Sequence, residues 1–466
     1  MIPLGLQEIC QAVKGTWRGA SAGAACPPKS QLTFTAVSTD TRSAKAGGLF
    51  VTLRGKQFDA HAFLDTAAAA GCAAAIVCRD GKMADGIAGK FPGGLIVVAD
   101  TTQALADLAA WHRGQVRAKV VAVTGSNGKT TVKLMIHHIL SASLKGTASP
   151  KSFNNEIGVP LTLLGVSADD DYVVCEVGTN APGEIDALSR IAQPDVAVIT
   201  SVAKTHLEKL GSIEQVATEK ATLLRHLREG GPAIVWGDSE VLDKALKRYN
   251  PRWVLFGVSD GCDYRLTGFE SSGRSQRFEV NGRLWVDMPQ PGRHNAINAL
   301  GALAVAMHMG IPLKEAGARL ASFSGAAMRL EWIEAGGVTL INDAYNANPA
   351  SVIAAADVLA DLPATRKVMI VGDMRELGDL AQMLHLETGS QIASRVDLLI
   401  GVGELGRYIA MGATEAGIEA RAYDNVAKAI PEVLALLRRG DAVLIKGSRA
   451  MGMEQLIEPI RSALKT

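Results

Sequence analysis

The sequence predicts an α/β protein of three domains, whose central domain is a parallel sheet covered by helices on both faces. The chain has 466 residues, which is too long for a single hydrophobic core. Apolar runs rich in β-branched residues alternate with helix-like segments along most of the chain, and this alternation is typical of parallel sheets. The pattern changes near residues 99 and 325–330, so we expect domains at residues 1–98, 99–327 and 328–466.

The first 98 residues predict the smallest α/β domain. The alanine-rich segment 61–71 is expected to be a helix that ends at Gly71, and the polar, glycine-rich stretch 79–94 is expected to be a loop. The strands expected here are 49–53, 74–77 and 95–98.

The middle of the chain has the most regular alternation, and an α/β pattern resumes near residue 330. Helices are expected at 101–114, 129–144 and 213–228, and a Pro/Gly-marked segment at 289–292 precedes an alanine-rich helix at 294–309. The strands expected in the central domain are 119–123, 172–177, 195–200 and 233–236. Those expected in the last domain are 338–341, 368–371, 397–400 and 442–445.

Charge and cysteine content exclude several classes of protein. The net charge is +1, so neither a nucleic acid nor an anionic membrane is expected as the main partner. Six cysteines are scattered without a Cys-x-x-Cys pair, which argues against a zinc ribbon or a disulfide framework and favours a reducing compartment. Neither a secretory signal nor an apolar stretch long enough to span a bilayer is visible. We therefore expect a cytoplasmic protein without membrane insertion.

A glycine-rich loop follows the strand 119–123. Its sequence is Gly125-Ser126-Asn127-Gly128-Lys129-Thr130-Thr131, and a helix is expected from Lys129 onward. Such a loop directs backbone N–H groups and a helix N-terminus at an anion. Lys129 would neutralise the outer phosphates of a nucleotide, and the Thr130 hydroxyl would bind Mg²⁺. Val123 stands where the usual pattern has its first glycine; an ordinary strand–turn–helix connection is the alternative, but the Gly-Lys-Thr-Thr ending favours a nucleotide.

Two further polar residues follow strands expected to end beside this loop. Glu176 stands at the carboxyl end of strand 172–177, where a carboxylate is well placed for Mg²⁺. His206 follows strand 195–200, where ligand-binding loops of parallel sheets occur. The respective alternatives are a solvated acid and an ordinary histidine.

Lys220 falls on the apolar stripe of the expected helix 213–228. A buried ammonium is costly unless it is paired or chemically altered. One solution is reaction of the neutral amine with CO₂, which gives a carbamate able to bind a metal ion. The other is a salt bridge, or a stem that carries the ammonium to the surface, and the sequence leaves both open. The apolar residues of the stripe are Ile213, Val216, Ala217, Leu223, Leu224 and Leu227.

Together these motifs resemble the Mur ligases over the whole chain. The loop 124–131 is similar to the family's own short version, which accounts for the missing glycine. Further central segments that resemble family signatures are 154–162, 176–178, 182–185, 206–208, 211–212 and 291–298. In the last domain, 343–351, 372–378 and 446–450 are similar to members that use D-alanyl-D-alanine; in the first, 40–42, 48–51 and 58–63 resemble a UDP-sugar-binding module. Ala60 and Thr222 depart from the family, which often has Gly and Glu there.

The resemblance implies a fold and an activity. It implies an N-terminal UDP-sugar-binding domain, a central P-loop-type ATP-binding domain and a C-terminal Rossmann-like domain. The implied reaction is ATP-dependent addition of D-alanyl-D-alanine to UDP-N-acetylmuramoyl-tripeptide through an acyl phosphate, in peptidoglycan precursor synthesis. The alternatives are another Mur or folylpolyglutamate-type ligase with a different amine acceptor, and a non-catalytic nucleotide-dependent regulatory protein.

The resemblance also implies cofactors, partners and site residues. ATP and Mg²⁺ are the implied cofactors, and the implied partners are small-molecule substrates. The protein is expected to be a monomer that closes on its ligands. Lys129, Glu176, His206 and Lys220 are the implied catalytic residues; Thr130 with Glu176, and His206 with carbamylated Lys220, would hold two Mg²⁺ ions. Besides the loop, the implied nucleotide contacts are His294, Asn295, Asn298, Arg329 and Asp343. The implied substrate contacts are Asp40, Thr41, Arg42, Asn154, Asn155, Tyr345, Asn346, Asn348, Arg375, Lys446, Ser448 and Arg449. For the asparagine-rich loop 345–349, ordinary turn chemistry is the alternative.

Overall fold

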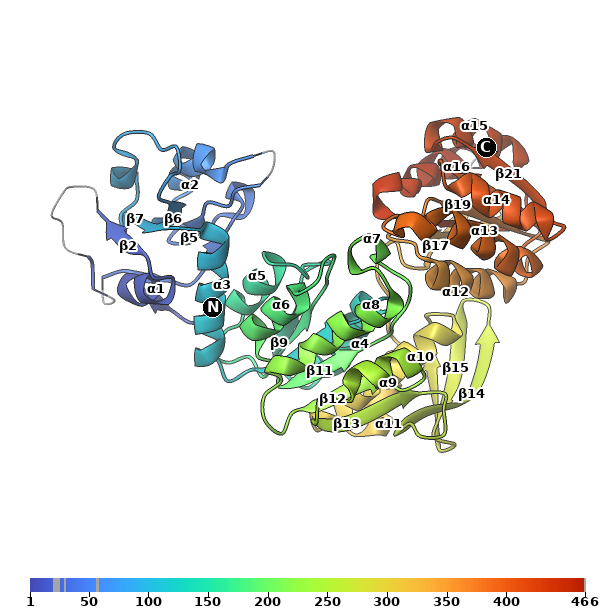
Figure 1. The fold of residues 1–466 in the computed structure, drawn as a ribbon, viewed down its shortest axis with the longest axis horizontal. Helices are drawn as coiled ribbons and strands as arrows, with labels where there is room; N and C mark the ends of the chain where they lie inside the picture. The colour runs from blue at the N-terminus through green and yellow to red at the C-terminus, as the bar shows by residue number, and fades with distance from the viewer. Residues whose placement is uncertain (20–25, 29–30, 56–57, 465–466) are drawn as a thin grey trace.

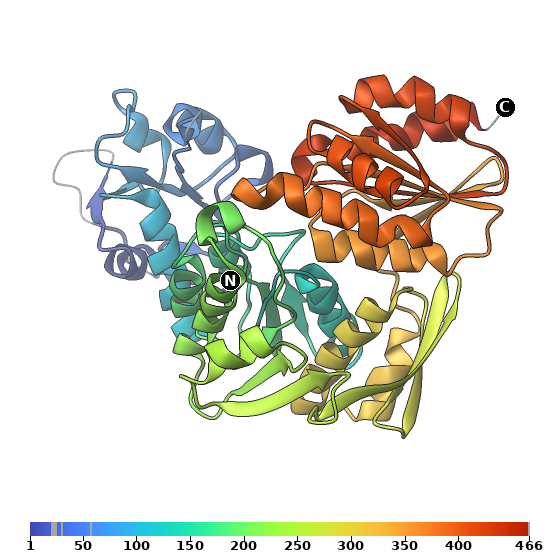
Figure 2. The ribbon, with the colours of Figure 1, turned by 45° about the vertical axis from the view of Figure 1, so that its right-hand side comes forward.

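The computed structural model describes residues 1–19, 26–28, 31–55 and 58–464. In that part of the chain the strands form three large sheets and one two-stranded pair (Figure 1). In both views the N-terminal and C-terminal bodies lie on either side of a central body that carries the largest sheet (Figures 1 and 2). The α/β class expected from the sequence is confirmed. Among the described helices, none is both long and apolar enough to cross a bilayer.

The N-terminal body contains a five-stranded sheet and the two-stranded pair. The sheet order is β2 (Thr16–Arg18), β7 (Leu95–Val98), β6 (Ala74–Cys78), β5 (Leu49–Val51) and β4 (Val37–Ser38), and β1 (Leu4–Gly5) pairs with β3 (Thr33–Phe34). Only β2 runs antiparallel to its neighbour within the five-stranded sheet. Its helices are α1 (Leu6–Ala12), η1 (Thr41–Ser43), η2 (Ala60–Phe63), α2 (Leu64–Ala69) and η3 (Ile87–Lys90).

Two sequence expectations for this body need correction. The helix expected at 61–71 starts as a 3₁₀ turn, η2, because the Asp59 carboxylate accepts the backbone N–H of His61 and tightens that turn. It continues as α2, which ends at Ala69, two residues before Gly71, whose φ is +84°. The stretch 79–94 contains η3 rather than being wholly irregular.

The central sheet has nine strands in one series. Their order is β16 (Leu284–Met288), β15 (Ser275–Val280), β14 (Tyr264–Ser272), β13 (Arg252–Gly257), β12 (Pro232–Trp236), β11 (Val196–Ile199), β8 (Lys119–Thr124), β10 (Tyr172–Glu176) and β9 (Gly146–Ala148). From β14 to β9 all neighbours are parallel. Register pairs Glu176 with Val123 and Ile199 with Thr124, so the loops after β10, β8 and β11 emerge side by side.

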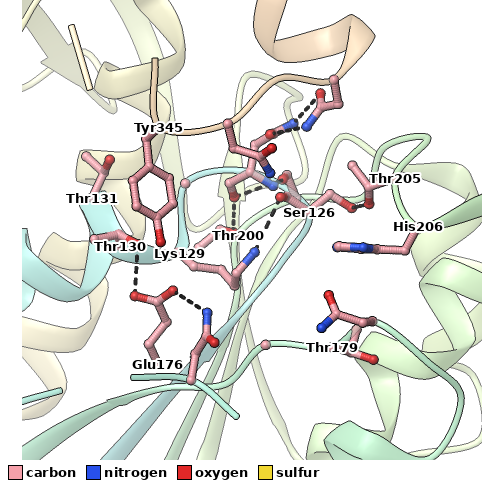
Figure 3. Close-up of a pocket in the computed structure, with 18 of the residues that line it drawn as sticks. Ser126, Lys129, Thr130, Thr131, Glu176, Thr179, Thr200, Thr205, His206 and Tyr345 are labelled. Atoms are coloured by element: carbon pink, nitrogen blue, oxygen red, sulfur yellow. Dashed lines mark hydrogen bonds between the residues drawn. The ribbon is translucent and has the colours of Figure 1, made fainter. Parts of the chain in front are cut away.

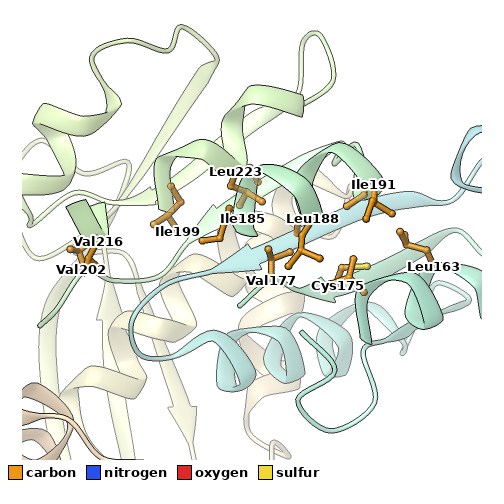
Figure 4. Close-up of a cluster of buried hydrophobic side chains, with 14 of the residues drawn as sticks. Leu163, Cys175, Val177, Ile185, Leu188, Ile191, Ile199, Val202, Val216 and Leu223 are labelled. Carbon is orange, nitrogen blue, oxygen red and sulfur yellow. The ribbon is translucent and has the colours of Figure 1, made fainter. Parts of the chain in front are cut away.

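Helices cover both faces of this sheet, as expected. Alternate residues of β8 point to opposite faces: Val120 and Ala122 enter one buried cluster, and Val121 and Val123 enter another. The first cluster includes residues of α6 (Glu184–Ala192) and α8 (Ile213–Ala221), part of which is drawn in Figure 4. The second includes residues of α4 (Lys129–Leu140), α10 (Arg293–His308) and α11 (Leu313–Leu320). The other central helices are α3 (Thr101–Gln115), α5 (Gly158–Leu164), α7 (Leu207–Leu210), η4 (Thr222–His226) and α9 (Glu240–Leu246).

The central sheet is not wholly parallel, contrary to the sequence expectation. Two hairpins add β15 and β16 antiparallel to its edge. The second hairpin turns at Asn281-Gly282, where both residues have positive φ, the conformation that favours Asn-Gly in tight hairpins. An Asn-Gly dipeptide between alternating apolar residues is a hairpin signal, and the expectation of a wholly parallel sheet did not take it into account.

The helices expected at 129–144 and 213–228 are also shorter than predicted. The first, α4, ends at Leu140. The second ends at Ala221 and continues as the 3₁₀ helix η4. The Thr222 hydroxyl donates to the Glu219 carbonyl at 2.6 Å, and such back-bonding competes with the regular helical pattern.

The C-terminal body has a six-stranded sheet. The order is β17 (Glu331–Ala335), β18 (Val338–Asp343), β22 (Asp441–Lys446), β19 (Arg366–Gly372), β20 (Leu398–Val402) and β21 (Glu419–Tyr423), and only β17 is antiparallel to its neighbour. The edge strands β17 and β21 escaped prediction because neither is a buried apolar run. The helices are α12 (Pro349–Ala360), η5 (Gly378–Leu380), α13 (Ala381–Ile392), η6 (Ala393–Arg395), α14 (Gly406–Glu415), α15 (Val426–Leu436), η7 (Arg449–Met451), η8 (Met453–Leu456) and α16 (Ile457–Ala463).

Candidate active site

A cavity of about 1390 Å³ is lined by residues of the central and C-terminal bodies. Its walls come from loops at the carboxyl ends of parallel strands, which is where α/β proteins bind ligands. Figure 3 shows Thr130, Glu176 and Tyr345 on one side of Lys129, and His206 on the other. The central loops are 126–131, 154–156, 176–180 and 200–206, and the C-terminal segments are 343–351, 375–376 and 446–450.

The phosphate loop requires glycine at two positions. Gly125 has φ +151°, and a Cβ there would overlap the Thr200 hydroxyl. Gly128 has φ +83°, and a Cβ there would overlap the Asn298 amide. Val123 lies in β8 and is fully buried. The glycine of the longer pattern is therefore absent because that position belongs to a core strand, and the loop is correspondingly short.

Lys129 begins α4 and points back into the loop. Its Nζ donates to the Gly125 carbonyl at 2.8 Å. Burial lowers the pKa of Lys129, although the carboxylate of Glu176 opposes that shift. The N–H groups of Ser126 and Asn127 donate to the carbonyl and hydroxyl oxygens of Ser201. The first N–H groups of α4 have no partner within the helix, so the start of α4 forms a site for anions.

The Glu176 carboxylate lies at the end of β10 with both oxygens hydrogen-bonded. Its Oε2 accepts from the Thr130 hydroxyl at 2.9 Å and from the Lys133 ammonium at 3.1 Å. Its Oε1 accepts from the Asn154 amide at 2.9 Å. Burial opposes ionisation, but the charges of Lys133 and Lys129 outweigh it and hold the pKa of Glu176 below its ordinary value. A charged carboxylate beside a phosphate loop suits a hard divalent cation.

Arg329 connects the C-terminal segment to this cluster. Its Nη2 donates to the Thr130 hydroxyl oxygen at 3.0 Å, and its guanidinium lies 4.1 Å from the centre of the Tyr345 ring. Thr130 therefore donates to Glu176 and accepts from Arg329. Within the C-terminal body, Asp343 and Lys446 lie opposite each other on neighbouring strands and form an ion pair, with charged atoms 2.6 Å apart.

The structure places the two residues expected to hold a second metal ion differently. His206 lines the cavity, has φ +55°, and its Nδ1 lies 2.5 Å from Oε2 of Glu376 in the C-terminal body. Lys220 is 1% exposed, as its place on the apolar stripe predicts, and is not among the lining residues. Burial, and then the charge of Lys129, lower the pKa of Lys220 well below its ordinary value. Within the described part of the chain, its ammonium makes no hydrogen bond or ion pair.

The first two turns of α10 contribute the remaining nucleotide candidates. Asn295 is buried and its amide donates to the Pro291 carbonyl at 2.8 Å. Asn298 is buried against Gly128. Burial lowers the pKa of His294 to about 4, so this histidine is neutral at pH 7. All three line the cavity.

The substrate candidates fall into two groups. Asp40, Thr41 and Arg42 lie in the N-terminal body, where Asp40 caps the short helix η1 and pairs with the exposed Arg42; none of the three lines the cavity. The other candidates do line it: Asn154, Asn155, Tyr345, Asn346, Asn348, Arg375, Lys446, Ser448 and Arg449.

Two residues that the sequence reasoning missed hold site residues in place. Lys133 donates to Glu176 from the second turn of α4, and Glu376 contacts His206. Lys133 could have been found by the argument applied to Lys220, since it adjoins Val132 and Ile136 on a buried helix face. Nothing local predicts Glu376, because its partner lies in another body.

A phosphate loop and a carboxylate on adjacent strands face a second α/β sheet whose loops enter the same cavity, an arrangement that suits an enzyme binding a nucleotide together with other substrates. Two family profiles match the chain, "Mur ligase middle domain" over residues 123–306 and "Mur ligase, glutamate ligase domain" over residues 328–449. The chain belongs to the Mur ligase family.

Individual relatives are similar to this chain over nearly its full length. A UDP-N-acetylmuramoyl-tripeptide–D-alanyl-D-alanine ligase of Bacillus subtilis (strain 168) is 35% identical over 471 residues, covering 99% of both chains. A crystal structure of MurF from Acinetobacter baumannii superposes with a TM-score of 0.88 at 33% identity, covering 99% of both chains. The MurF ligase of Thermotoga maritima, solved in complex with ADP, superposes with a TM-score of 0.81 at 27% identity, covering 92% of this chain and 98% of that one.

Proposed function

We propose that the chain joins D-alanyl-D-alanine to UDP-N-acetylmuramoyl-tripeptide, with conversion of ATP to ADP and phosphate, in peptidoglycan precursor synthesis. The observation that carries this function is full-length similarity to a ligase of that name, 35% identical over 99% of both chains. The cavity is consistent with it, because one wall offers a phosphate loop and another an amide-rich and basic surface from the C-terminal body.

In the first step the terminal carboxylate of the tripeptide attacks the γ-phosphate of ATP, forming an acyl phosphate and releasing ADP. Two anions must approach each other, so catalysis depends on charge neutralisation and alignment. Lys129 and Arg329 bring positive charge to the phosphate loop: the first points back into it and the second donates to Thr130. The loop, with His294, Asn295 and Asn298 behind it, binds ATP.

The residues around Thr130 and Glu176 fit a magnesium ion. Mg²⁺ is typically held by one or two carboxylates together with substrate phosphates and water. The described residues include no cluster of three or more His, Cys, Asp or Glu, which is compatible with such a site and not with an all-protein cage. The ion would supply charge neutralisation at the phosphates.

In this proposal, His206 and a carbamylated Lys220 would hold a second Mg²⁺ ion. With Nδ1 of His206 beside Glu376, Nε2 is the nitrogen available to a metal. Burial favours the neutral amine of Lys220, which is the form that attacks CO₂. A C–N bond forms, the amine loses one proton to solvent, and the product is an anionic carbamate.

In the second step the neutral amine of D-alanyl-D-alanine attacks the acyl carbon and forms a C–N bond. The C–O bond to phosphate then breaks, phosphate leaves, and the nitrogen loses one proton to solvent. The C-terminal residues of the cavity bind this dipeptide and the tetrahedral intermediate: Tyr345, Asn346, Asn348, Arg375, Lys446, Ser448 and Arg449. Asp343 orients Lys446 at 2.6 Å, and Lys446 also donates to the Asn346 carbonyl at 3.0 Å. Asn154 and Asn155 line the path of the tripeptide.

The three bodies divide this work. Residues 1–98, through Asp40, Thr41 and Arg42, bind the UDP-sugar; residues 99–327 bind ATP; and residues 328–466 bind the amine and complete the site. The enzyme acts as a cytoplasmic monomer on small-molecule substrates.

The deciding experiment is an amine-specificity assay. Phosphate release is measured with ATP, Mg²⁺ and the UDP-linked tripeptide, and D-alanyl-D-alanine is compared with meso-diaminopimelate, L-lysine and glutamate. The proposal requires that, of these four amines, only D-alanyl-D-alanine supports phosphate release. Preference for another amine would assign a different ligase, and nucleotide binding without turnover would indicate a regulatory protein.

A further inference from the structure

Lys133 is a fully buried lysine close to the phosphate loop. It lies on α4, four residues after Lys129, and its side chain is 0% exposed. Its helix neighbours Val132, Met135 and Ile136 are core residues with no exposure. Burying a charged lysine among apolar side chains costs folding free energy unless the ammonium is paired or hydrogen-bonded.

Two hydrogen bonds hold the Lys133 ammonium. It donates to Oε2 of Glu176 at 3.1 Å and to the backbone carbonyl of Lys151. Lys151 has φ +47° and belongs to the segment between β9 and α5. Lys133 therefore links the helix of the phosphate loop, the carboxylate of β10 and the segment that leads to Asn154.

This arrangement fixes the Glu176 carboxylate from two sides. Thr130 and Lys133 occupy Oε2, while Asn154 donates to Oε1. Lys129 takes no part in these bonds, because its ammonium is directed to the carbonyls of Gly125 and Ser126. Lys133, and not the lysine of the phosphate loop, is the cation in direct contact with Glu176.

We infer that Lys133 is a positioning residue for the metal–nucleotide site, which keeps Glu176 oriented toward Thr130 so that the cation accompanying the nucleotide meets a preformed ligand. The inference rests on the role given to Glu176 in the proposed function. Partners that orient a metal ligand typically change metal affinity by about 10- to 100-fold. A purely structural ion pair would change stability and leave that affinity unchanged.

The test measures Mn²⁺ binding to the full-length protein in the presence of ADP, by electron paramagnetic resonance, for wild type and for Lys133→Met and Lys133→Gln. We expect the Kd for Mn²⁺ to rise about tenfold or more, while the affinity for ADP without metal changes less than about twofold. The matched control is Arg113→Met, because Arg113 is another buried cation of the central body, paired with Asp195 at 2.6 Å and absent from the cavity wall. Arg113→Met should lower the melting temperature and leave the Mn²⁺ affinity at the wild-type value.

The outcomes separate the inference from the proposed function. Wild-type Mn²⁺ affinity in either folded Lys133 variant, with only a lower melting temperature, overturns the role of Lys133. Failure of both variants to fold also overturns it, in favour of a structural ion pair. Absence of Mn²⁺ binding in the wild type would instead overturn the metal role of Glu176. A wrong amine acceptor leaves all these results intact, because the experiment contains no amine substrate.

Discussion

Asn127 and Asn348 exchange two amide hydrogen bonds although 221 residues separate them in the chain. Nδ2 of Asn348 lies 2.6 Å from Oδ1 of Asn127, and Nδ2 of Asn127 lies 3.3 Å from Oδ1 of Asn348. Asn348 is also the N-cap of α12, because its Oδ1 accepts the backbone N–H of Ser351 at 3.0 Å. The pair thus ties the phosphate loop to the first turn of a C-terminal helix. Arg329 makes a second link, to Thr130, so we expect occupancy of the loop and the position of the C-terminal body to be coupled.

Asn348→Asp tests this coupling without removing the cap. Aspartate is as good an N-cap as asparagine, so the free energy of unfolding should change by less than about 1 kcal/mol. The variant loses the donor to Asn127 and places a carboxylate beside the phosphate site, so the KM for ATP should rise about tenfold. Steady-state phosphate release and urea unfolding measure the two effects. An unchanged KM for ATP would show that the pair plays no part in nucleotide binding.

Gly128→Ala should abolish nucleotide binding. The position has φ +83°, and the new methyl group would meet the Asn298 amide, so the loop must distort or open. The control is Gly114→Ala in α3, where an added Cβ meets nothing within 4 Å and a helical alanine gains about 1 kcal/mol. Calorimetric titration with ADP should detect no binding to Gly128→Ala and wild-type binding to Gly114→Ala. Equal affinity in both variants would contradict the assignment of the loop.

The central layers could be predicted because their physical cause is local. A buried parallel strand is a continuous apolar run, so β8, β10, β11 and β12 were readable within a residue or two. The edge strand β21 was not, because three of its five residues are exposed and its sequence resembles a polar loop. The break of α8 at Thr222 depends on one hydroxyl hydrogen bond, which periodicity does not encode.

Site residues divide in the same way. Gly125–Thr131 and Glu176 follow strands whose register brings them together, so chain order predicted their proximity. Lys220 was placed on a buried face by helical periodicity, and it is buried. The contacts of His206 with Glu376 and of Asn127 with Asn348 join separate bodies, so no local pattern indicates them.

Asp373→Asn should weaken binding of the amine substrate more than that of ATP. Asp373 is fully buried; its Oδ1 accepts the N–H groups of Leu405 and Gly406, and its Oδ2 lies 3.1 Å from Nη2 of Arg375. An asparagine can keep the two backbone bonds, but its amide nitrogen would face the guanidinium and release Arg375. We expect the KM for D-alanyl-D-alanine to rise about tenfold, as for loss of one hydrogen bond to a charged group, with the KM for ATP unchanged. Equal rises in both constants would indicate general loosening of the C-terminal body.

Stability should fall as the pH decreases from about 6.5 to about 4, in part through His112. This histidine is fully buried and its Nε2 accepts the backbone N–H of Ile2 at 3.1 Å, and burial lowers its pKa to about 4. Between that value and its ordinary pKa near 6.5, His112 is protonated in the unfolded chain but neutral in the folded chain. The contribution of His112 to the free energy of unfolding is therefore complete above pH 6.5 and is lost as the pH falls toward 4. It amounts to roughly 3 kcal/mol. His112→Gln keeps an acceptor without titrating, so urea unfolding of this variant should depend less steeply on pH between 6.5 and 4; the same slope as wild type would refute the assignment.

Lys220→Ala should lower ligase turnover by about a thousandfold or more, since a metal ligand supplies several kcal/mol of transition-state stabilisation. The buried amine, whose pKa lies well below its ordinary value, is expected to react with CO₂, so ¹³C-bicarbonate should give the wild type a carbamate resonance that the variant lacks. Bicarbonate alone should not restore turnover to the variant, because the variant has no amine at this position, whereas a short-chain carboxylic acid can occupy the vacated space and supply the missing anion.

The control is Lys244→Ala, which removes an exposed lysine paired with Glu240 and should leave turnover and the resonance unchanged. Full activity of Lys220→Ala would exclude the carbamate, and a carbamate signal in an inactive, well-folded His206→Ala would show that the modification forms without the second metal.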